Sequence, residues 1–369
     1  MKIINENLVD FEKQSSFYGK LNLIATVKSF QLQEIRARYI TSKKSGYSNS
    51  GSVERRKPAI GGVVSLVLEN GTLIAESVLA RLKEPRGIDI CDRFLAVSSD
   101  KKVFIIKNNG DLKELSDEWF SYIHTVQFSP ENSNLLLVSS SGFDLILEYD
   151  HTTNIKTFEW LAWENGFNKS IDPKTGETVY LTRSKKEYEQ YLLKNQSSIL
   201  ITEPSNQDLP TAKRAAFINS VTYDSNKKLL ATFFHEGKVY KIDRFTGVSE
   251  PIISGLKNPH GGHSIENKIV ATSTASGELI IQDESQKRII NFSALDGKPQ
   301  ELSGLEWVQN TVTYKNLFIS IDSNRTNFVI IDPDNRKYDI IPYNKDWAIQ
   351  DFIVGEISDD QKKRLSLFK

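Results

Sequence analysis

The sequence predicts an all-β fold, a six-bladed β-propeller with four-stranded blades, from a repeated unit and its nearly constant period. The unit is an apolar strand that ends at a polar turn and is followed by another strand. It occurs five times, with the turn at Lys107, Asp150, Asp243, Asp283 and Asp332. These positions lie 43, 93, 40 and 49 residues apart, and the longest spacing is one repeat plus an insertion of about 50 residues. A period of about 40–50 residues is typical of propeller blades.

Two more apolar strands precede this unit in each repeat, rich in the β-branched and aromatic residues that half-buried sheets favour. Turn-forming pairs separate the second strand from the third: Ser99-Asp100, Ser141-Gly142, Glu236-Gly237, Ser276-Gly277 and Ser323-Asn324. We expect one propeller domain over 1–369, with blades at 20–79, 86–115, 122–158, 217–252, 260–292 and 303–342. A two-sheet sandwich is the competing architecture, and the constant repeat favours the propeller.

The first blade is expected to come from the N-terminal region. Residues 21–30 and 34–42 are predicted strands, and residues 63–79 are predicted to form a hairpin about Asn70-Gly71, a strong turn signal. A C-terminal strand at 346–357 is predicted to close the ring, because closure removes exposed sheet edges. Whether the N-terminal or the C-terminal strand closes it stays open.

Two segments interrupt the repeat. Residues 43–58 are polar, basic and rich in Gly and Ser, which predicts a loop between the second and third strands of the first blade. Residues 159–216 separate the third blade from the fourth and contain a predicted helix at 185–196. Strands in a blade alternate in direction, so both segments are expected on one face, over the mouth of the central channel. Long loops in a compact domain are usually functional or disordered.

Composition excludes several classes of partner and site. Lys plus Arg and Asp plus Glu both number 47, so the net charge of zero argues against a nucleic-acid partner. The single cysteine, Cys91, excludes an intrachain disulfide and a cysteine-based zinc site, and is expected to be a small buried residue. The N-terminal residues lack the apolar segment of a signal peptide, and no apolar run approaches a membrane span of about 20 residues. We therefore expect a cytoplasmic protein without a membrane partner.

The first strand of each blade should line the channel, with its first residues at the mouth that the two long segments cover. In register these are Arg86, His124, Asn219, His260 and Ser303. His263 follows three residues into its strand, and His235 lies at a second-to-third-strand turn of the same face. Four of the five histidines are thus expected on one face. The fifth, His151, is expected to be solvated at the opposite face.

Two interpretations of these residues compete. His124, His260, His263 and His235 are candidate metal ligands, because neutral imidazole binds transition metals. His124 and His260, with Arg86 and Asn219, are alternatively candidate catalytic groups, since histidine exchanges protons near neutral pH. The alternative without a functional role is that these are polar channel residues that form hydrogen bonds with each other and with water. No short ligand spacing such as HExxH is present.

The start of the long insertion supplies candidate substrate-binding residues. Trp160 and Trp163 either form the floor of a ligand pocket or anchor the insertion on the propeller, and Glu164 beside them is a candidate ligand or acid. Glu306 is expected near the channel, where it pairs with Arg86 or both bind a substrate. The acidic segment 332–335 is predicted to be a turn, because it lacks the Gly and terminal Glu of a calcium loop.

Three stretches carry a resemblance to known propellers. Residues 124–150, followed by the Trp-rich segment 158–167, have a His-led strand, a turn of small residues and an acidic-ended strand. They resemble bacterial and archaeal propellers distantly related to arylsulfotransferases. Residues 258–283 and 303–322 are similar to successive blades of an uncharacterised bacterial six-bladed propeller family.

The resemblance implies candidate roles. Arylsulfotransferases use a catalytic histidine in the channel, so His124 or His260 would be the counterpart. Gluconolactonase-like propellers bind a divalent metal through Glu, Asn and Asp, and Asn219 matches one such position. The implied cofactor is therefore a divalent transition metal or calcium, if any. Fold membership alone does not define function.

Two functions follow from the sequence. The first is an enzyme of transferase, lyase or hydrolase type that acts on a small molecule or modified peptide at the channel mouth, with the insertion as roof. The alternative is a non-catalytic scaffold propeller that recruits a protein partner. Neither the reaction nor the oligomeric state follows from the sequence.

Overall fold

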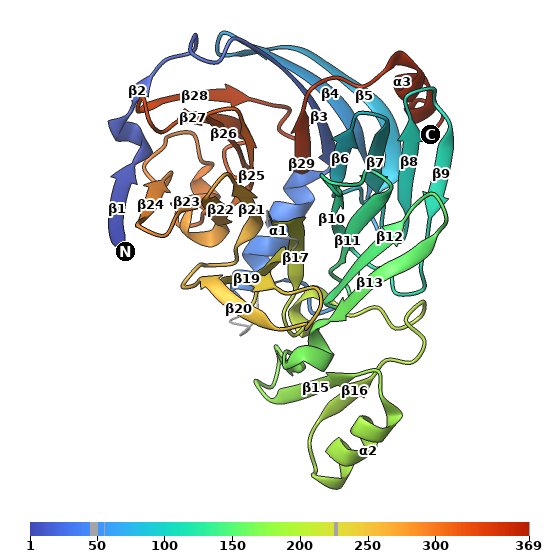
Figure 1. Cartoon of the computed structure of the whole chain (residues 1–369). Helices are drawn as coiled ribbons and strands as arrows, with labels where there is room; N and C mark the ends of the chain where they lie inside the picture. The colour runs from blue at the N-terminus through green and yellow to red at the C-terminus, as the bar shows by residue number, and fades with distance from the viewer. Residues whose placement is uncertain (45–50, 55, 225–227, 369) are drawn as a thin grey trace.

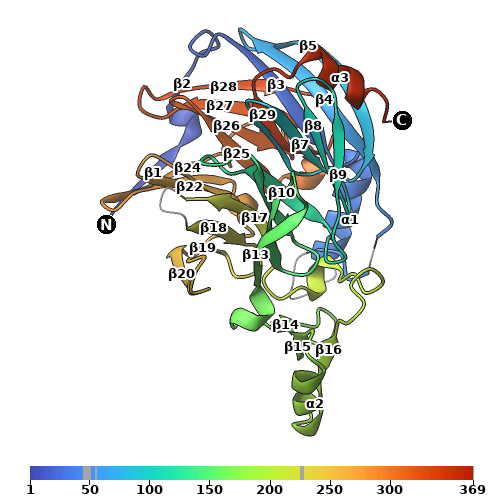
Figure 2. The same ribbon diagram turned by 45° about the vertical axis from the view of Figure 1, so that its right-hand side comes forward.

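A computed structural model describes residues 1–44, 51–54, 56–224 and 228–368. Strands make up 47% of the chain and helices 12%. In the described part, the strands form six sheets of four or five strands and one three-stranded sheet. Figures 1 and 2 show the larger sheets standing around a common centre, with the small sheet outside this ring. The fold is a β-propeller.

Within each large sheet the chain runs from the innermost strand outward, except that a C-terminal strand is innermost in the first sheet and N-terminal strands form the outer edges of the fifth and sixth sheets. The first sheet holds, from the inside, β29 (Ile349–Val354), β3 (Lys20–Val27), β4 (Ile60–Glu69) and β5 (Thr72–Lys83). The second holds β6 (Ile88–Cys91), β7 (Phe94–Ser98), β8 (Val103–Lys107) and β9 (Leu112–Leu115). The third holds β10 (Ile123–Phe128), β11 (Leu135–Ser140), β12 (Leu145–Asp150) and β13 (Ile155–Leu161).

The remaining three large sheets follow the same order. The fourth holds β17 (Ile218–Tyr223), β18 (Leu229–Phe233), β19 (Lys238–Ile242) and β20 (Ser249–Ile253). The fifth holds β21 (His260–Ile265), β22 (Lys268–Ser273), β23 (Glu278–Gln282), β24 (Gln286–Asn291) and β1 (Lys2–Asn7). The sixth holds β25 (Val308–Tyr314), β26 (Leu317–Asp322), β27 (Asn327–Asp332), β28 (Lys337–Pro342) and β2 (Glu12–Lys13).

The innermost strands form a closed circle of contacts. β6 contacts β10, β10 contacts β17, β17 contacts β21, and β21 contacts β25, while β29 contacts both β25 and β6. β29 lies in the predicted closing segment and pairs antiparallel with β3, with Val354 opposite Leu23. The C-terminal strand thus completes the sheet that the N-terminal strands begin.

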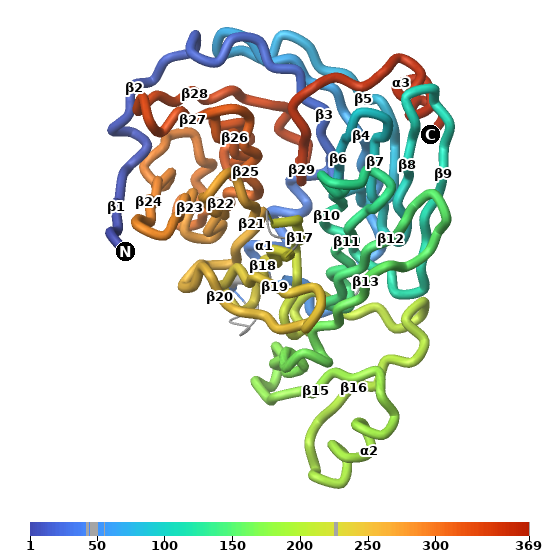
Figure 3. Tube along the Cα trace, viewed as in Figure 1, coloured from blue at the N-terminus to red at the C-terminus, as the bar shows by residue number. Residues whose placement is uncertain are grey.

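The first N-terminal strands lie on the outside of the ring. β1 pairs in parallel with β24, and β2 pairs in parallel with β28. Figure 3 shows this segment running along the outer edges of two neighbouring sheets. Glu6 of β1 pairs with both Arg288 and Arg336, so ion pairs reinforce the backbone pairing. These strands cover two outer sheet edges, which are otherwise templates for aggregation.

The segment between β3 and β4 differs from the prediction. Residues 34–42 were expected to form a strand, but they belong to a helix, α1 (Leu32–Lys44). The prediction was wrong because this segment docks as a helix: Leu32 is buried, and Gln33 donates to the carbonyl of Lys345. Of the predicted loop 43–58, residues 45–50 and 55 lie outside the described residues.

The long insertion forms a small subdomain. It holds β14 (Lys169–Ile171), β15 (Thr178–Thr182), α2 (Lys185–Leu193) and β16 (Ser198–Leu200), and α2 confirms the predicted helix. Figures 1 and 2 show this body projecting away from the ring. The insertion was predicted to cover the channel mouth, and this prediction is wrong for the small subdomain that β14, β15, α2 and β16 form.

A buried carboxylate anchors the insertion where it returns to the ring. Asp144 accepts hydrogen bonds from the indole of Trp163 and from the backbone N–H groups of Ala215, Ala216 and Ile218. These groups would otherwise be buried donors without partners. Both ends of the insertion are thereby fixed to one turn of the third sheet.

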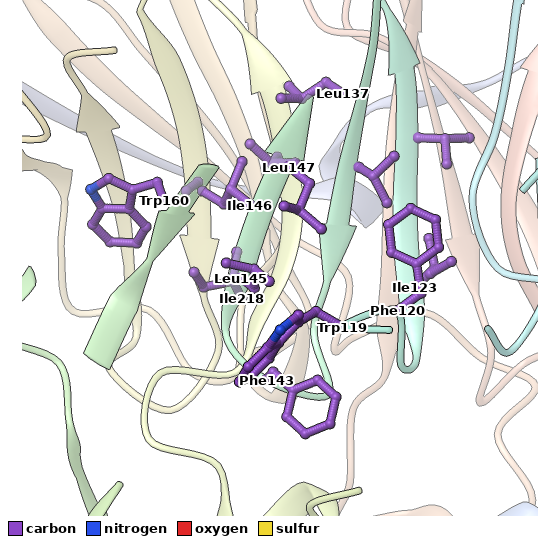
Figure 4. Packing of buried hydrophobic residues seen from close by; sticks show 14 of the residues in the cluster. Trp119, Phe120, Ile123, Leu137, Phe143, Leu145, Ile146, Leu147, Trp160 and Ile218 are labelled. Atoms are coloured by element: carbon purple, nitrogen blue, oxygen red, sulfur yellow. The ribbon is translucent and has the colours of Figure 1, made fainter. Parts of the chain in front are cut away.

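The largest apolar core lies between the second, third and fourth sheets. Figure 4 shows side chains of β10, β11 and β12 packed against Trp119, Phe143 and Trp160. Alternation along β12 directs Leu145 and Leu147 to one face of its sheet and Ile146 to the other, and all three are buried. The C-terminal helix α3 (Asp359–Leu365) closes a second core, with Leu365 buried beside β5 and β8.

The predicted turns are confirmed, and two single-residue expectations are not. Asn70 and Gly71 have positive φ angles of 47° and 80° in the β4–β5 hairpin, and residues 333–336 form the turn after β27. His151, expected to be solvated, is 2% exposed and packs edge-on against Phe94 and Phe128. Cys91 is only partly buried. No described helix is both long and apolar enough to span a bilayer.

Two carboxylates of the inner strands should make stability depend on pH. Burial raises the pKa of Asp89 and of Asp351 to about 7. A raised pKa means that stability is fully present below pH 4, where the unfolded group is also protonated, and is lost as the pH rises through about 7. We expect Asp351→Asn to raise the free energy of unfolding by on the order of 2 kcal/mol at pH 8. At pH 4.5 the gain should be much smaller.

Chemical denaturation at both pH values measures this difference. Asn keeps an oxygen that can accept from the side-chain amide of Asn310, as Asp351 does at 2.8 Å. The exposed Asp296 provides the control, because Asp296→Asn should leave the pH dependence unchanged. An equal effect of Asp351→Asn at both pH values would contradict the assignment.

Candidate functional site

A pocket of about 710 Å³ lies at the end of the ring where the inner strands begin. Its channel wall carries polar residues at or near the first positions of these strands. They are Arg86, His124, His260, Gln309 and Gln350. The volume falls within the range of about 300–1,000 Å³ that is typical of small-ligand sites.

A recurrent backbone feature positions the channel wall. Four inner strands are entered through a non-glycine residue in the left-handed region, with φ between 43° and 51°. These residues are Glu84, Tyr122, Phe217 and Asn258, two positions before Arg86, His124, Asn219 and His260 respectively. Such backbone costs about 1–3 kcal/mol per residue and clusters at functional sites. Its recurrence at one mouth marks this end of the channel.

Bulges near the start of the inner strands change the direction in which the first side chains of these strands point. The pairing register is interrupted near the start of β10, β17, β21, β25 and β29. His124, Gln309 and Gln350 lie within such interruptions. A bulge bends its strand and turns a side chain out of simple alternation. Polar side chains from several strands therefore converge on the pocket.

The helix α1 forms the roof, and Figure 1 shows it behind the centre of the ring. Arg36 donates to the carbonyls of Ser323 and Asn324, at 2.7 and 2.9 Å, which fixes α1 on the turn after β26. Tyr39 packs edge-on against Trp307, with ring centroids 4.7 Å apart, and both line the pocket. Residues 51–54 and Arg56 complete the roof. From the long insertion, only Thr211 lines the pocket.

Lys28, which also lines the pocket, is held by a close backbone approach at the end of β3. Its backbone N–H donates to the carbonyl of Ala348 at 2.9 Å. A Cβ on Gly61 would lie 2.7 Å from the carbonyl carbon of Lys28 and 1.9 Å from the carbonyl oxygen of Val27, so only glycine fits there. Two neighbouring strands thus fix where the lysine side chain starts.

One buried carboxylate binds two guanidinium groups beside the pocket. Glu84, 3% exposed, lies 3.3 Å from Arg86 and 3.7 Å from Arg56. Burial alone would raise the pKa of Glu84, but the charges of Arg86 and Arg56 outweigh this effect and lower it. The carboxylate is therefore ionised at neutral pH and is already engaged.

Lys28 has no such partner. Its ammonium group makes no hydrogen bond or ion pair with any described residue. Removal from water lowers its pKa most, and the charges of Arg86 and Arg56 lower it further, to about 7. Arg38 adds to this repulsion, and Glu84 opposes it. The uncharged amine is therefore far more populated at neutral pH than in an ordinary exposed lysine.

The two histidines of the pocket are neutral. His124 Nδ1 lies 3.1 Å from the carbonyl of Tyr122, so Nδ1 carries the hydrogen and Nε2 can accept from Arg86 at 3.4 Å. Burial and the charge of Arg86 lower the pKa of His124 well below its ordinary value. His260 Nδ1 lies 2.8 Å from Thr274 Oγ1, and burial lowers its pKa to about 3.

The rest of the wall is aromatic, with a few polar atoms that lack partners. The rings are Tyr39, Tyr122, Phe217, Phe234 and Trp307. Among the described residues, Gln350 Oε1 and the Nε atoms of Arg56 and Arg86 are buried without a hydrogen-bond partner. Buried polar groups without partners are rare, and each one calls for an explanation such as a bound molecule.

Arg86, His124 and His260 are thus placed in the pocket as the sequence indicates, and Asn219 is not. Asn219 is buried and donates to the carbonyl of Pro259 at 2.7 Å, away from the pocket wall. Ser303 precedes the inner strand, which starts at Val308, so Gln309 occupies the expected position in its place.

The candidate substrate-binding residues have structural roles. Trp160 is buried against Phe233 and donates to the carbonyl of Gly247, and Trp163 donates to Asp144, as the anchoring alternative predicts. Glu164 forms a two-point ion pair with Arg183. None of the three residues Trp160, Trp163 and Glu164 lines the pocket.

Glu306 does not pair with Arg86. It pairs with Arg325 at 3.0 Å and with Lys298 at 2.5 Å. Arg86 pairs with Glu84 instead, because both flank the same strand entrance. The expected Arg86–Glu306 pair is therefore wrong.

The other two candidate metal ligands lie apart from His124 and His260. His263 contacts Thr313 Oγ1 at 2.9 Å, and His235 contacts the carbonyl of Thr211 at 3.0 Å. Neither lines the pocket. The described residues contain no group of three or more His, Cys, Asp or Glu side chains that could hold a metal ion. The four histidines therefore do not form the predicted metal site.

Sequence reasoning missed Lys28, Tyr39, Arg56 and Gln350. Gln350 belongs to β29, which is the inner strand of the first sheet, whereas 21–30 was expected in that place. Reading the closing segment in register would have found it. For Lys28 and Arg56 the signal was weaker, since a lysine after an apolar strand is usually a solvated end.

No protein-family model and no curated protein matches the sequence. Among solved structures, a chain in a crystal structure of a nidogen/laminin complex is 10% identical, with 92% of this chain and 100% of that chain covered and a TM-score of 0.52. A protein of unknown function from Bacteroides caccae is 11% identical, with 90% and 97% covered and a TM-score of 0.50. Virginiamycin B lyase from Staphylococcus aureus is 9% identical, with 70% and 84% covered and a TM-score of 0.42.

At such identities the likeness concerns the fold alone, and the class of protein is a β-propeller. These structures do not single out one propeller family. The sequence resemblance to arylsulfotransferase-related or gluconolactonase-like propellers stays a prediction.

The histidines of the pocket should resist protonation. We expect His124 and His260 to stay neutral between pH 5 and 8, because burial and nearby cations disfavour the imidazolium form. Histidine-selective NMR of the ring nitrogens, with His124→Gln and His260→Gln for assignment, checks this. A midpoint for either residue near its ordinary value of about 6.5 would contradict the described pocket.

Proposed function

We propose that the protein binds a small anionic molecule with an aromatic or apolar body at the α1 mouth of a six-bladed propeller. One observation carries this proposal, the excess of cations on the pocket wall. The wall holds Lys28, Arg38, Arg56 and Arg86 with one acidic residue, Glu54. The nearby Glu84 is already engaged by two arginines. A carboxylate or phosphate would supply the missing acceptors.

The aromatic wall supports the second part of the proposal. Tyr39 and Trp307 face each other across the roof and the channel wall, and Phe217 and Phe234 lie beside the two histidines. Such rings bury a flat apolar body while a few polar groups fix its orientation. A scaffold propeller would be expected to use a broad exposed patch, so the concave cationic site supports a small molecule over a protein partner.

The six-bladed ring and the single domain over 1–369 are part of the proposal. The circle of inner-strand contacts and the pairing of β29 with β3 support both. In this arrangement residues 162–217 are an insertion in the connection between the third and fourth blades.

Titration calorimetry with phenyllactate, an aromatic carboxylate, tests the proposal. We expect Lys28→Met and Arg56→Met each to weaken binding by about 10-fold or more, because a hydrogen bond to a charged group contributes roughly 1.5–3 kcal/mol. Lys102→Met removes a charge from an exposed ion pair with Glu114 and serves as the control. Unchanged affinity in both pocket variants, or no binding to the wild type, would refute the proposal.

Binding should also depend on pH. Lys28 loses its charge as the pH rises through about 7, so the affinity for phenyllactate should fall between pH 6 and pH 8. The charged groups that face Lys28 are Arg38, Arg56, Arg86 and Glu84, and the charges of Arg86 and Arg56 lower the pKa of Glu84. Lys28→Met should therefore abolish most of the pH dependence. A dependence that persists in Lys28→Met would assign it to another group.

A further inference from the structure

We propose that Lys28 is a reactive amine that forms an imine with the carbonyl group of an anionic aldehyde or keto acid in the α1 pocket. The inference rests on the proposed function and narrows it to one class of ligand, aromatic or apolar anions with a carbonyl next to the charge. It also assigns a covalent step to the site.

The geometry favours a free amine at this position. Lys28 lies on the wall of the pocket without a carboxylate partner in the described part of the chain, whereas Glu84 is occupied by Arg86 and Arg56. Lysine amines become nucleophilic when they are desolvated next to another cationic group. Both conditions hold here, and the pKa of about 7 reflects them. An ordinary exposed lysine is uncharged in only roughly one molecule in 2,500 at pH 7.

The surrounding groups suit an anionic carbonyl compound. The guanidinium groups of Arg56 and Arg86 are fixed by Glu84 and remain positively charged beside the amine. A carboxylate that binds to this cationic wall brings an adjacent carbonyl within the same pocket as the Lys28 amine. Holding two reactants together in this way can lower a barrier by several kcal/mol. The aromatic rings of the roof would then hold the rest of the molecule.

The step is a condensation that needs no further reactant. The lone pair of Lys28 Nζ adds to the carbonyl carbon and forms a C–N bond. The two Nζ hydrogens and the carbonyl oxygen then leave as one molecule of water, and a C=N bond remains. The neutral His260 is a second base in the pocket, with Nδ1 engaged by Thr274 and Nε2 without a partner among the described residues.

Borohydride trapping tests the inference on the full-length protein. Phenylpyruvate, which has a keto group, and phenyllactate, which has a hydroxyl at the same position, form a matched pair of probes. We expect phenylpyruvate with borohydride to label one site per chain, mapped by peptide mass spectrometry to Lys28. With phenylpyruvate at a concentration that saturates the site at every pH, labelling should rise with pH around a midpoint near 7, and exposed lysines such as Lys102 should stay unlabelled at the same dose.

Two variants separate the covalent step from binding. Lys28→Arg keeps a positive charge but has no free amine, so it should bind phenyllactate and give no adduct. Lys102→Met should label like the wild type. If phenyllactate binds but phenylpyruvate gives no adduct at Lys28, the imine inference fails and the proposed function stands. If neither probe binds the wild type, the proposed function itself fails. Adducts scattered over surface lysines would also overturn the inference.

Discussion

The pairing of the C-terminal inner strand β29 with β3 is the interaction on which the pocket depends. β29 joins β3 through backbone hydrogen bonds and contacts both β25 and β6, so it links the two ends of the ring. The same junction places the site. The residue before β29, Ala348, accepts from the backbone of Lys28, and Asp346 accepts from the backbone of Leu32 at the start of α1. Ring closure therefore positions the amine, the roof helix and Gln350 together.

Electrostatics at this mouth follows from an unequal number of cations and carboxylates. Glu84 satisfies Arg86 and Arg56, and its charge is shared between them. Lys28 is left without a partner among the described residues, and its pKa is lowered first by removal from water and then by the charges of Arg86 and Arg56. The histidines respond in the same way and stay neutral. The site thus pairs fixed positive charge with neutral bases.

The repeat, the turns and part of the channel wall follow from the sequence, because strand periodicity and turn residues are local signals. Arg86, His124 and His260 could be found by register counting along recurrent strands. The helix α1 could not, since EIRARYITS alternates enough to suggest a strand, and the contacts that dock it as a helix, such as those of Arg36 with the turn after β26, are tertiary. Ser303 was expected where Gln309 lies, because bulges and a late strand start shift the register.

The two ends of the channel differ in the charge of the side chains that line them. Among the described residues, a pocket of about 820 Å³ at the other ends of the inner strands is lined by five acidic residues and one basic residue. They are Asp89, Asp92, Glu131, Asp224 and Glu266, with Arg93. The equal totals of 47 acidic and 47 basic residues therefore conceal a separation of charge along the channel. This separation bears on the proposed ligand, because a small anion responds to the local field and not to the sum over the chain. Net charge in the sequence argues against a polyanion partner, and the same number is compatible with a site for one small anion.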